Sequence, residues 1–448
     1  MLTSASTSHV FHRLANSVPP LAVGASGIEI VDSTGKRYLD ASGGAAVSCI
    51  GHGEPRVVEA IRQQAAALDY AHNVSFTSEA AEELAAFLCR ATPLALEKVQ
   101  FVGSGSEAVE AALKLARQFH IERGDAGRHV VISRLQSYHG NTLGALARGG
   151  NVARSRPYAP MMVESPRIEP CFEYHHRRPD ESPLAYGQRA ADALEEEILR
   201  IGSDKVAAFI AETVVGATSG AVPPAPGYFQ RIREICDRYG ILLILDEVMC
   251  GASRTGPFLA CETEGIQPDI VTLAKGLGGG YQSIAAVMCT RQVHQAFAEG
   301  SGRFVHGHTF MAHPVACAAA LAVQKVIQQD GLALNVARQG ETLHHLLEAR
   351  LGHHPHVGDI RGRGLLQAIE MVADRSSKQP FPSARGLAAA VDSECRARGL
   401  MVYPGTGTVD GVAGDHILLA PPYNVSREAL HQIVDRLGDA VETVLGRT

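Results

Sequence analysis

The sequence predicts an α/β fold in which helices cover a mostly parallel sheet. Short apolar runs occupy residues 130–132, 206–210, 241–245 and 270–273. Most of these runs are followed by Gly, Ser or Pro and then by amphipathic sequence. The runs are continuously apolar rather than alternating, which is typical of parallel strands buried on both faces. These three observations together indicate the α/β class.

Further elements extend this prediction toward both ends of the chain. Residues 100–102 predict another strand, directly before a helix from Ser106 to about His120. Residues 27–40 alternate around a Ser-Thr-Gly turn and predict a β-hairpin. Beyond Asp330, helical patterns, short strands and Gly- or Pro-containing turns follow one another.

The length of 448 residues suits two closely packed domains. We expect a large α/β domain over residues 50–315. A smaller α+β domain would combine the N-terminal segment, residues 1–49, with residues 316–448. These boundaries follow from the change of pattern along the chain and are defined to within several residues.

Composition excludes several classes of partner. The chain is 46% hydrophobic and 20% charged, with a net charge of -6 and no Lys/Arg cluster, so we expect no nucleic-acid binding. No apolar run approaches the roughly 18 residues of a membrane span, and the start lacks a secretory pattern. Nine scattered cysteines without a CxxC indicate reduced thiols in a cytoplasmic protein. His175-His176 and His353-His354 have no cysteine partners at ligand spacing, so we expect no metal site.

Chemically distinctive residues follow the predicted strands, where ligands bind in open α/β sheets. The first group is Gly103-Ser104-Gly105-Ser106-Glu107, between a strand and a helix. Backbone N–H groups at a helix start can cradle a phosphate. A plain Ser N-cap explains the same residues. The spacing of Gly103, Gly105 and Ala108 also fits a dinucleotide fingerprint, in which Arg134 would suit the 2′-phosphate of NADP.

Asp246 and Lys275 each follow an apolar strand. A carboxylate at the end of a buried strand is costly unless it is paired, and a protonated pyridine nitrogen is a fitting partner. Lys275 enters the glycine-rich segment 276–280, where burial would favour the uncharged amine that condenses with an aldehyde. The alternatives are an Asp that caps a turn and a Lys that extends to solvent from a strand end.

Two further residues lie in corresponding positions. Glu212 closes the run 206–210, and we expect it to support the Asp246 neighbourhood rather than to act as an acid or base. Tyr138 follows the run 130–132 and offers an aromatic face for stacking on a planar ring.

A set of short motifs resembles the class III (omega-amino-acid) aminotransferases. The likeness runs from about Gly27 to the C-terminus, and the order of the motifs is specific although each fragment alone is weak. The motifs are Ser104-Gly105-Ser106-Glu107-Ala108, Tyr138-His139-Gly140, Asp246-Glu247-Val248, Arg254-Thr255-Gly256, Ala274-Lys275-Gly276 and Gly307-His308-Thr309-Phe310. Asp40-Ala41-Ser42-Gly43-Gly44 and Gly51-His52-Gly53 resemble the N-terminal segment of the family.

The resemblance implies a fold-type I transferase that binds pyridoxal 5′-phosphate as a homodimer, or a tetramer, with active sites at the subunit interface. The residues it implies around the cofactor are Ser104, Gly105 and Ser106 at the phosphate, Tyr138 and Val248 on the two ring faces, Glu212 nearby, Asp246 at the ring nitrogen, Lys275 as the Schiff-base lysine, and Thr309 reaching the phosphate from the partner chain. Of these, Lys275 and Asp246 would be catalytic.

Some positions depart from the pattern of the family. Thr213 replaces the proline often found beside the acidic residue, and Met249-Cys250 stand where many relatives have Gln. Amino-acid-specific members often carry an arginine shortly before a C-terminal Pro-Pro, but residues 416–422 contain none. A bidentate arginine is the usual clamp for a carboxylate. Arg148, Arg154 or Arg363 could serve instead.

The expected reaction is transfer of an amino group from an amino acid or omega-amino compound to a 2-oxo acid by a ping-pong mechanism. A racemase, epimerase or aminomutase on the same scaffold remains an alternative, because the fate of the proton depends on fine geometry. An NADP oxidoreductase built on the Gly103 turn would leave Lys275 and Asp246 without a role. A non-catalytic regulatory module is a further alternative, but the chain has no DNA-binding appendage and no basic patch to support it.

Overall fold

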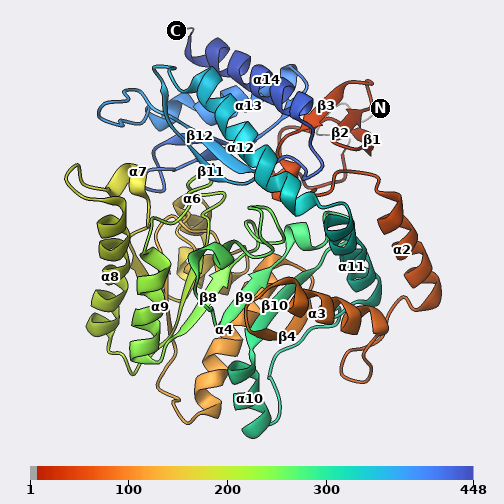
Figure 1. The fold of residues 1–448 in the computed structure, drawn as a ribbon, viewed down its shortest axis with the longest axis vertical. Helices are drawn as coiled ribbons and strands as arrows, with labels where there is room; N and C mark the ends of the chain where they lie inside the picture. The colour runs from red at the N-terminus through yellow and green to blue at the C-terminus, as the bar shows by residue number, and fades with distance from the viewer. Residues whose placement is uncertain (1–7, 447–448) are drawn as a thin grey trace.

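A seven-stranded sheet forms the centre of the structure, a computed structural model that describes residues 8–446 (Figure 1). The strands, in spatial order, are β4 (Leu96–Val102), β10 (Ala285–Thr290), β9 (Ile270–Leu273), β8 (Leu242–Asp246), β7 (Val206–Glu212), β5 (Val130–Arg134) and β6 (Arg167–Ile168). β10 runs antiparallel to both of its neighbours, and every other pairing in this sheet is parallel. The predicted α/β class and its mostly parallel sheet are confirmed.

Each of the four apolar runs forms a strand of this sheet. β7, β8 and β9 are buried along their whole length, which explains why their sequences show no polar alternation. β7 and β8 extend past the predicted runs to Glu212 and Asp246, because both carboxylate-bearing residues still pair with a neighbouring strand.

Helices cover both faces of the large sheet. The core on one face includes side chains from α3 (Glu79–Ala91), α8 (Pro183–Ile201), α9 (Tyr228–Tyr239) and α11 (Pro314–Gln329). The core on the other face includes side chains from α4 (Gly105–Glu122), α5 (Leu143–Arg148) and α10 (Arg291–Glu299). Local signals mark several helix starts: Ser182 caps α8 before Pro183, and Pro314 opens α11. The predicted helix from Ser106 is confirmed as α4.

Both ends of the chain meet above this sheet in the view of Figure 1. The hairpin predicted over residues 27–40 is confirmed as β2 (Glu29–Asp32) and β3 (Arg37–Asp40), with β1 (Ala22–Ser26) beside β2 and the C-terminal β13 (Leu400–Met401) parallel to β3. A third, antiparallel sheet has the order β11 (Val357–Arg363), β12 (Leu366–Met371), β15 (Asp415–Leu419) and β14 (Tyr403–Thr406). Three long helices accompany these strands: α12 (Leu332–Leu351), α13 (Leu387–Ala397) and α14 (Arg427–Leu445).

The helix α11 belongs to two hydrophobic cores. Cys317 and Ala320 pack in the core of the large sheet, whereas Val323 and Ile327 pack in the core beneath α12 and α14. One rigid helix therefore connects the two layers. The predicted domain boundaries at residues 49/50 and 315/316 stay a prediction.

The remaining short elements connect these layers. They are α1 (Gly43–Ala46), α2 (Pro55–Ala67), α6 (Val152–Ser155), α7 (Glu173–His176) and the 3-10 turns η2 (Arg156–Met161), η3 (Ala260–Glu264), η4 (Lys275–Leu277) and η5 (Ser383–Arg385). All nine cysteines are free, and eight of them are buried. Within residues 8–446, no helix is both long and apolar enough to cross a membrane.

His416 of β15 is a buried ring enclosed by two glycines. A methyl group on Gly405 would lie 2.0 Å from its Nε2, and one on Gly220 would lie 2.7 Å from its Cδ2. Its Nδ1 bonds to the hydroxyl of Thr408 at 2.7 Å. Burial, reinforced by the charge of Arg361, lowers the pKa of His416 from 6.5 to about 3.

We therefore expect His416 to make folding sensitive to acid. Between pH 6.5 and 3 the unfolded chain binds a proton at this ring and the folded chain does not, so stability falls as the pH falls through this range. The loss at pH 5 is about 2 kcal/mol. Urea unfolding at pH 7 and pH 5 should show a smaller pH dependence for His416→Gln than for the wild type, and an unchanged dependence for the exposed control His431→Gln. An equal dependence in all three proteins would contradict this role.

Candidate active site

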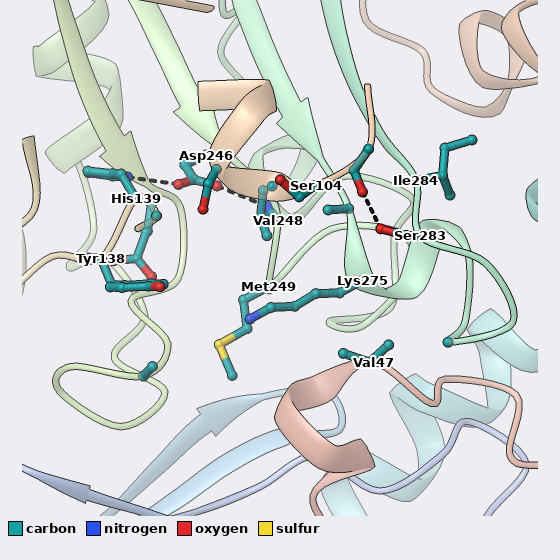
Figure 2. Close-up of a pocket in the computed structure, with 18 of the residues that line it drawn as sticks. Val47, Ser104, Tyr138, His139, Asp246, Val248, Met249, Lys275, Ser283 and Ile284 are labelled. Atoms are coloured by element: carbon teal, nitrogen blue, oxygen red, sulfur yellow. Dashed lines mark hydrogen bonds and ion pairs between the residues drawn. The ribbon is translucent and has the colours of Figure 1, made fainter. Parts of the chain in front are cut away.

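A cavity of about 420 Å³ lies where the central strands end (Figure 2). Eight of the nine site residues predicted from the sequence line it: Ser104, Gly105, Ser106, Tyr138, Glu212, Asp246, Val248 and Lys275. They come from segments up to 171 residues apart (104 to 275) that the parallel sheet brings to one edge. This is the edge at which ligands bind in open α/β sheets.

The Gly-Ser turn between β4 and α4 forms one end of the cavity. The hydroxyl of Ser104 accepts a hydrogen bond from the N–H of Glu107 at 3.3 Å and so caps α4, which begins at Gly105. A side chain on Gly105 would place its Cβ 2.9 Å from Val248 Cγ1, so glycine is needed for this close packing. The capping and the anion-binding interpretations are compatible, because the first N–H groups of an 18-residue helix face the cavity end.

Asp246 ends β8 with its carboxylate 3% exposed. Its Oδ1 accepts hydrogen bonds from the N–H of Val248 at 3.1 Å and the hydroxyl of Thr272 at 3.2 Å. Oδ2 bonds to Nδ1 of His139 at 2.7 Å. These partners offset the cost of burying the carboxylate and fix its orientation in the cavity wall.

His139 is a site residue whose role the sequence did not reveal. It belongs to the Tyr138-His139-Gly140 motif, but only the pairing of β5 and β8 on either side of β7 brings its ring to Asp246. Its Nε2 is buried and has no partner among the described residues. The ring therefore serves the carboxylate of Asp246 alone.

Glu212 at the end of β7 fastens the loop that carries Tyr138. Its Oε1 accepts a hydrogen bond from the N–H of Tyr138 at 3.0 Å, and its Oε2 accepts one from the N–H of Gly216 at 2.9 Å. Burial raises the pKa of Glu212; nearby His139 opposes this rise and the carboxylate of Asp246 adds to it. Because both oxygens are used by backbone amides, Glu212 positions the cavity wall.

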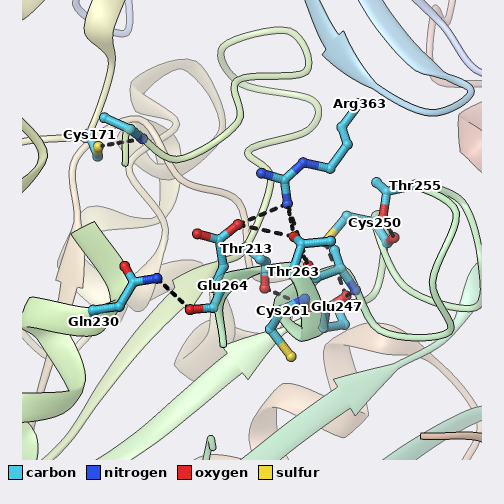
Figure 3. Close-up of polar contacts among 12 residues, drawn as sticks. Cys171, Thr213, Gln230, Glu247, Cys250, Thr255, Cys261, Thr263, Glu264 and Arg363 are labelled. Atoms are coloured by element: carbon cyan, nitrogen blue, oxygen red, sulfur yellow. Dashed lines mark hydrogen bonds and ion pairs between the residues drawn. The ribbon is translucent and has the colours of Figure 1, made fainter. Parts of the chain in front are cut away.

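A third buried carboxylate, that of Glu247, follows Asp246 in the chain (Figure 3). It accepts hydrogen bonds from the hydroxyl of Thr213 at 2.5 Å and from the N–H groups of Ala260 and Cys261 at 2.8 and 2.9 Å. Thr213, which stands where relatives often have proline, thus supplies a donor that proline lacks. The network ties the ends of β7 and β8 to η3.

Lys275 enters the cavity from the end of β9 (Figure 2). Its backbone has a positive φ of 45°, which is uncommon and costly for a residue with a side chain. Gln324 of α11 holds this turn by donating to the carbonyls of Gly276 and Leu277 at 3.0 and 2.9 Å.

The amine of Lys275 is buried and unpaired. It makes no hydrogen bond or ion pair with any residue from 8 to 446. Burial lowers its pKa, an effect that Asp246 and Glu212 partly oppose. A desolvated, unpartnered amine with access to a cavity is a nucleophile.

The remaining wall of the cavity is largely apolar. Val47, Ala217, Met249 and Ile284 contribute to it, and Figure 2 shows Met249 beside the amine of Lys275. Sequence reasoning noted Met249 only as a departure from relatives. Its place on the wall depends on Gly216, where a Cβ would lie 2.1 Å from the Met249 sulfur.

Thr309 is the predicted site residue that this cavity does not include. It is exposed, and its carbonyl accepts a hydrogen bond from the hydroxyl of Tyr70 at 3.1 Å. The expectation for Thr309 concerns the site of a partner chain, and it stays a prediction.

The structure argues against a dinucleotide at the Gly103 turn. Arg134, the expected 2′-phosphate ligand, is only 2% exposed; its guanidinium donates to the carbonyl of Glu212 and lies 5.8 Å from the ring centre of Tyr228. It is therefore committed to the core beneath the sheet edge.

The donor set fits pyridoxal phosphate in three respects. A helix N-terminus with a glycine cradle suits a phosphate, an oriented buried carboxylate suits a protonated ring nitrogen, and a buried amine with a lowered pKa suits an aldehyde. Among residues 8–446, no group of three or more His, Cys, Asp or Glu side chains is arranged to hold a metal ion.

Comparisons with known proteins agree with a site of this kind. The sequence profile described as Aminotransferase class-III matches residues 13–441. An uncharacterized aminotransferase of Schizosaccharomyces pombe is 42% identical over 98% of this chain and 96% of its own length. The taurine–pyruvate aminotransferase of Rhodobacter capsulatus is 34% identical over 100% of this chain and 97% of its own. The omega transaminase of Pseudomonas jessenii, solved in complex with PMP, is 32% identical with a TM-score of 0.89, covering 95% of this chain and 93% of that one.

We expect His139→Phe to weaken binding of pyridoxal phosphate. The substitution keeps a ring at this position but removes the hydrogen bond to Asp246. Loss of a hydrogen bond to a charged group costs about 1.5–3 kcal/mol, or roughly 10- to 100-fold in affinity. Absorbance titration of the apo-protein measures the effect. The control His120→Phe alters a buried histidine that bonds to a backbone carbonyl outside the cavity. Equal affinities for wild type and His139→Phe would refute the role.

Proposed function

The chain belongs to the class III aminotransferase family, and from this we propose that it transfers an amino group to a 2-oxo acid in two half-reactions at the cavity of Lys275 and Asp246. The observation that carries the proposal is the presence of a buried, unpaired amine and an oriented carboxylate on the wall of one cavity. When bound, pyridoxal phosphate supplies an aldehyde that captures the amino group and an electron-poor ring that stabilises negative charge at the substrate carbon.

Lys275 holds the cofactor covalently and then acts as the base. When it is free, its Nζ would accept the proton from the carbon that bears the amino group and later return that proton. The lowered pKa of Lys275 favours this role, because only an uncharged amine can accept a proton. The strained backbone at Lys275 and the two bonds from Gln324 keep the amine in place.

Asp246 keeps the ring nitrogen protonated. His139, Thr272 and the N–H of Val248 hold its carboxylate in one orientation, in which it would pair with the ring nitrogen of the cofactor. Tyr138 and Val248 would contact the two faces of the ring, and Glu212 fixes the loop that carries Tyr138. Backbone N–H groups at Gly105 and Ser106, with Ser104, bind the phosphate.

A second subunit completes the phosphate site through its Thr309. Thr309 lies in an exposed segment with large apolar neighbours: Val305 is 68% exposed and Phe310 is 62% exposed, and Phe76 nearby in the fold is 69% exposed. Such a surface is typical of a protein interface. This supports a homodimer in which each chain lends Thr309 to the other.

The donor is an amino acid or an omega-amino compound of modest size. The apolar wall of Val47, Ala217 and Met249 accepts a short carbon chain beside Lys275. We place the protein in the cytoplasm, where nine free cysteines would remain reduced. A racemase, epimerase or aminomutase would share Lys275 and Asp246, and only the aminotransferase releases a new amino acid from pyruvate.

Lys275→Ala should abolish both covalent attachment of the cofactor and turnover. The visible absorbance of the attached cofactor and the formation of alanine from pyruvate report these two properties. Lys325→Ala, which removes a half-exposed lysine paired with Glu83, is the matched control and should retain both. Turnover by Lys275→Ala at the wild-type rate would overturn the mechanism.

Complementation between two inactive chains tests the contribution of Thr309 from the partner. At limiting cofactor, Thr309→Ala should lose activity through weaker phosphate binding. In a heterodimer of Lys275→Ala and Thr309→Ala chains, one of the two sites is wild type. Purified heterodimers should therefore recover up to about half of the wild-type activity, well above either parent. No recovery would show that Thr309 does not act across the interface.

A further inference from the structure

The proposed reaction needs a cation for the carboxylate of the 2-oxo acid, and the cavity lining does not provide a free one. Its charged side chains are Glu212, Asp246 and Lys275, and Lys275 is committed to the cofactor and the proton. A substrate carboxylate that leaves water must find a charged donor, for which arginine is the best geometric match. Our inference rests on the proposed function and concerns the residue that binds this carboxylate.

The arginines suggested by the sequence differ in their availability. Arg363 is engaged by Glu264 at 2.9 Å and by the hydroxyl of Thr263 (Figure 3). Arg148 lines a different cavity, together with Lys114. Arg363 is therefore paired, and Arg148 faces a cavity other than that of Lys275.

Another arginine near the lysine loop is also committed. Arg254 is fully buried, donates to the carbonyls of Leu365 and Pro421 at 3.2 and 2.6 Å, and lies 4.5 Å from the ring centre of Tyr423. It holds the C-terminal segment against the large sheet.

Arg154 of α6 has a different environment. Its guanidinium carbon lies 4.6 Å from the ring centre of Tyr138, which lines the cavity. Among residues 8–446 the guanidinium has no acidic partner and no hydrogen bond; the one bond at this residue is from its backbone N–H to the side chain of Asn151 at 3.1 Å. The side chain is half-buried, so its charge is only partly compensated by water.

The backbone that carries Arg154 is anchored while its side chain is not. A Cβ on Gly411 would lie 2.8 Å from Val152 Cγ2, so the loop over residues 407–414 packs closely on α6. A cation stacked on a ring is held more weakly than one in a bidentate bond to a carboxylate. The guanidinium can therefore leave the ring of Tyr138 and bind a substrate carboxylate while α6 stays in place.

We propose that Arg154 binds the carboxylate of the 2-oxo acid acceptor and of the amino acid product. It is a specificity-determining residue: it selects anionic acceptors, whereas Lys275 and Asp246 act on any amine or carbonyl that reaches the cofactor. This assigns to α6 the function that a C-terminal arginine would otherwise supply, and residues 416–422 contain no arginine.

A single half-reaction tests this without knowledge of the natural donor. The enzyme is loaded with pyridoxamine phosphate and mixed with either pyruvate or propanal, which has a similar size but no charge. The absorbance change gives the single-turnover rate and the half-saturating concentration for each acceptor. For Arg154→Gln we expect the half-saturating concentration of pyruvate to rise roughly 10- to 100-fold, with that of propanal unchanged.

Two further variants sharpen the result. Arg154→Lys keeps the charge without the bidentate geometry and should lie between wild type and Arg154→Gln. Arg156→Gln removes an exposed arginine two residues away and should behave as wild type. Equal losses with pyruvate and propanal, or no loss with either, would overturn the proposal. Failure of the wild-type enzyme with both acceptors would instead count against the proposed aminotransfer.

Discussion

The parallel hydrogen bonds that join β8 to β7 and β9 place two carboxylates and an amine at one edge of the sheet. Glu212 pairs with Asp246, and Asp246 pairs with Thr272, three residues before Lys275. A shift of one residue in either pairing would turn the affected side chains to the opposite face. The full burial of these strands makes such a shift costly, because it would break a close-packed core on both faces.

The burial of charge around the cavity follows one rule. Each of these two buried carboxylates is held by several hydrogen-bond partners: Asp246 by Val248, Thr272 and His139, and Glu247 by Thr213 and two backbone N–H groups. None of these bonds uses the amine of Lys275. A direct ion pair between Asp246 and Lys275 would have stabilised a charged lysine, and the separation of the two groups leaves the amine available for chemistry.

Much of this arrangement could be predicted from single positions in the sequence. Asp246 and Lys275 are conspicuous because a charged residue directly follows an apolar strand, and the Gly103–Ser106 turn is conspicuous because glycine and serine separate a strand from a helix. Features that depend on spatial neighbours could not be predicted in this way. The bond between His139 and Asp246 depends on the strand order β5, β7, β8, which the chain sequence does not specify.

The same limit applies to the arginines and to the boundaries of elements. Arg148, Arg154 and Arg363 look equivalent in the sequence, and only the fold shows that Arg363 is paired with Glu264, that Arg148 faces another cavity and that Arg154 stacks on a residue of the site. β7 and β8 continue beyond their apolar runs because backbone pairing extends to their acidic final residues. Residue type alone predicted that both strands end with the apolar run, before Glu212 and Asp246.

The helix α11 has a mechanical consequence. One of its faces is embedded in the core of the large sheet and another in the core of the C-terminal layer, while Gln324 between them grips the turn after Lys275. A displacement of the C-terminal layer must therefore either bend this helix or move the amine of Lys275 with it. The absorbance of pyridoxal phosphate bound at Lys275 should therefore change if the C-terminal layer separates from the large sheet, although the strands of that layer lie outside the cavity.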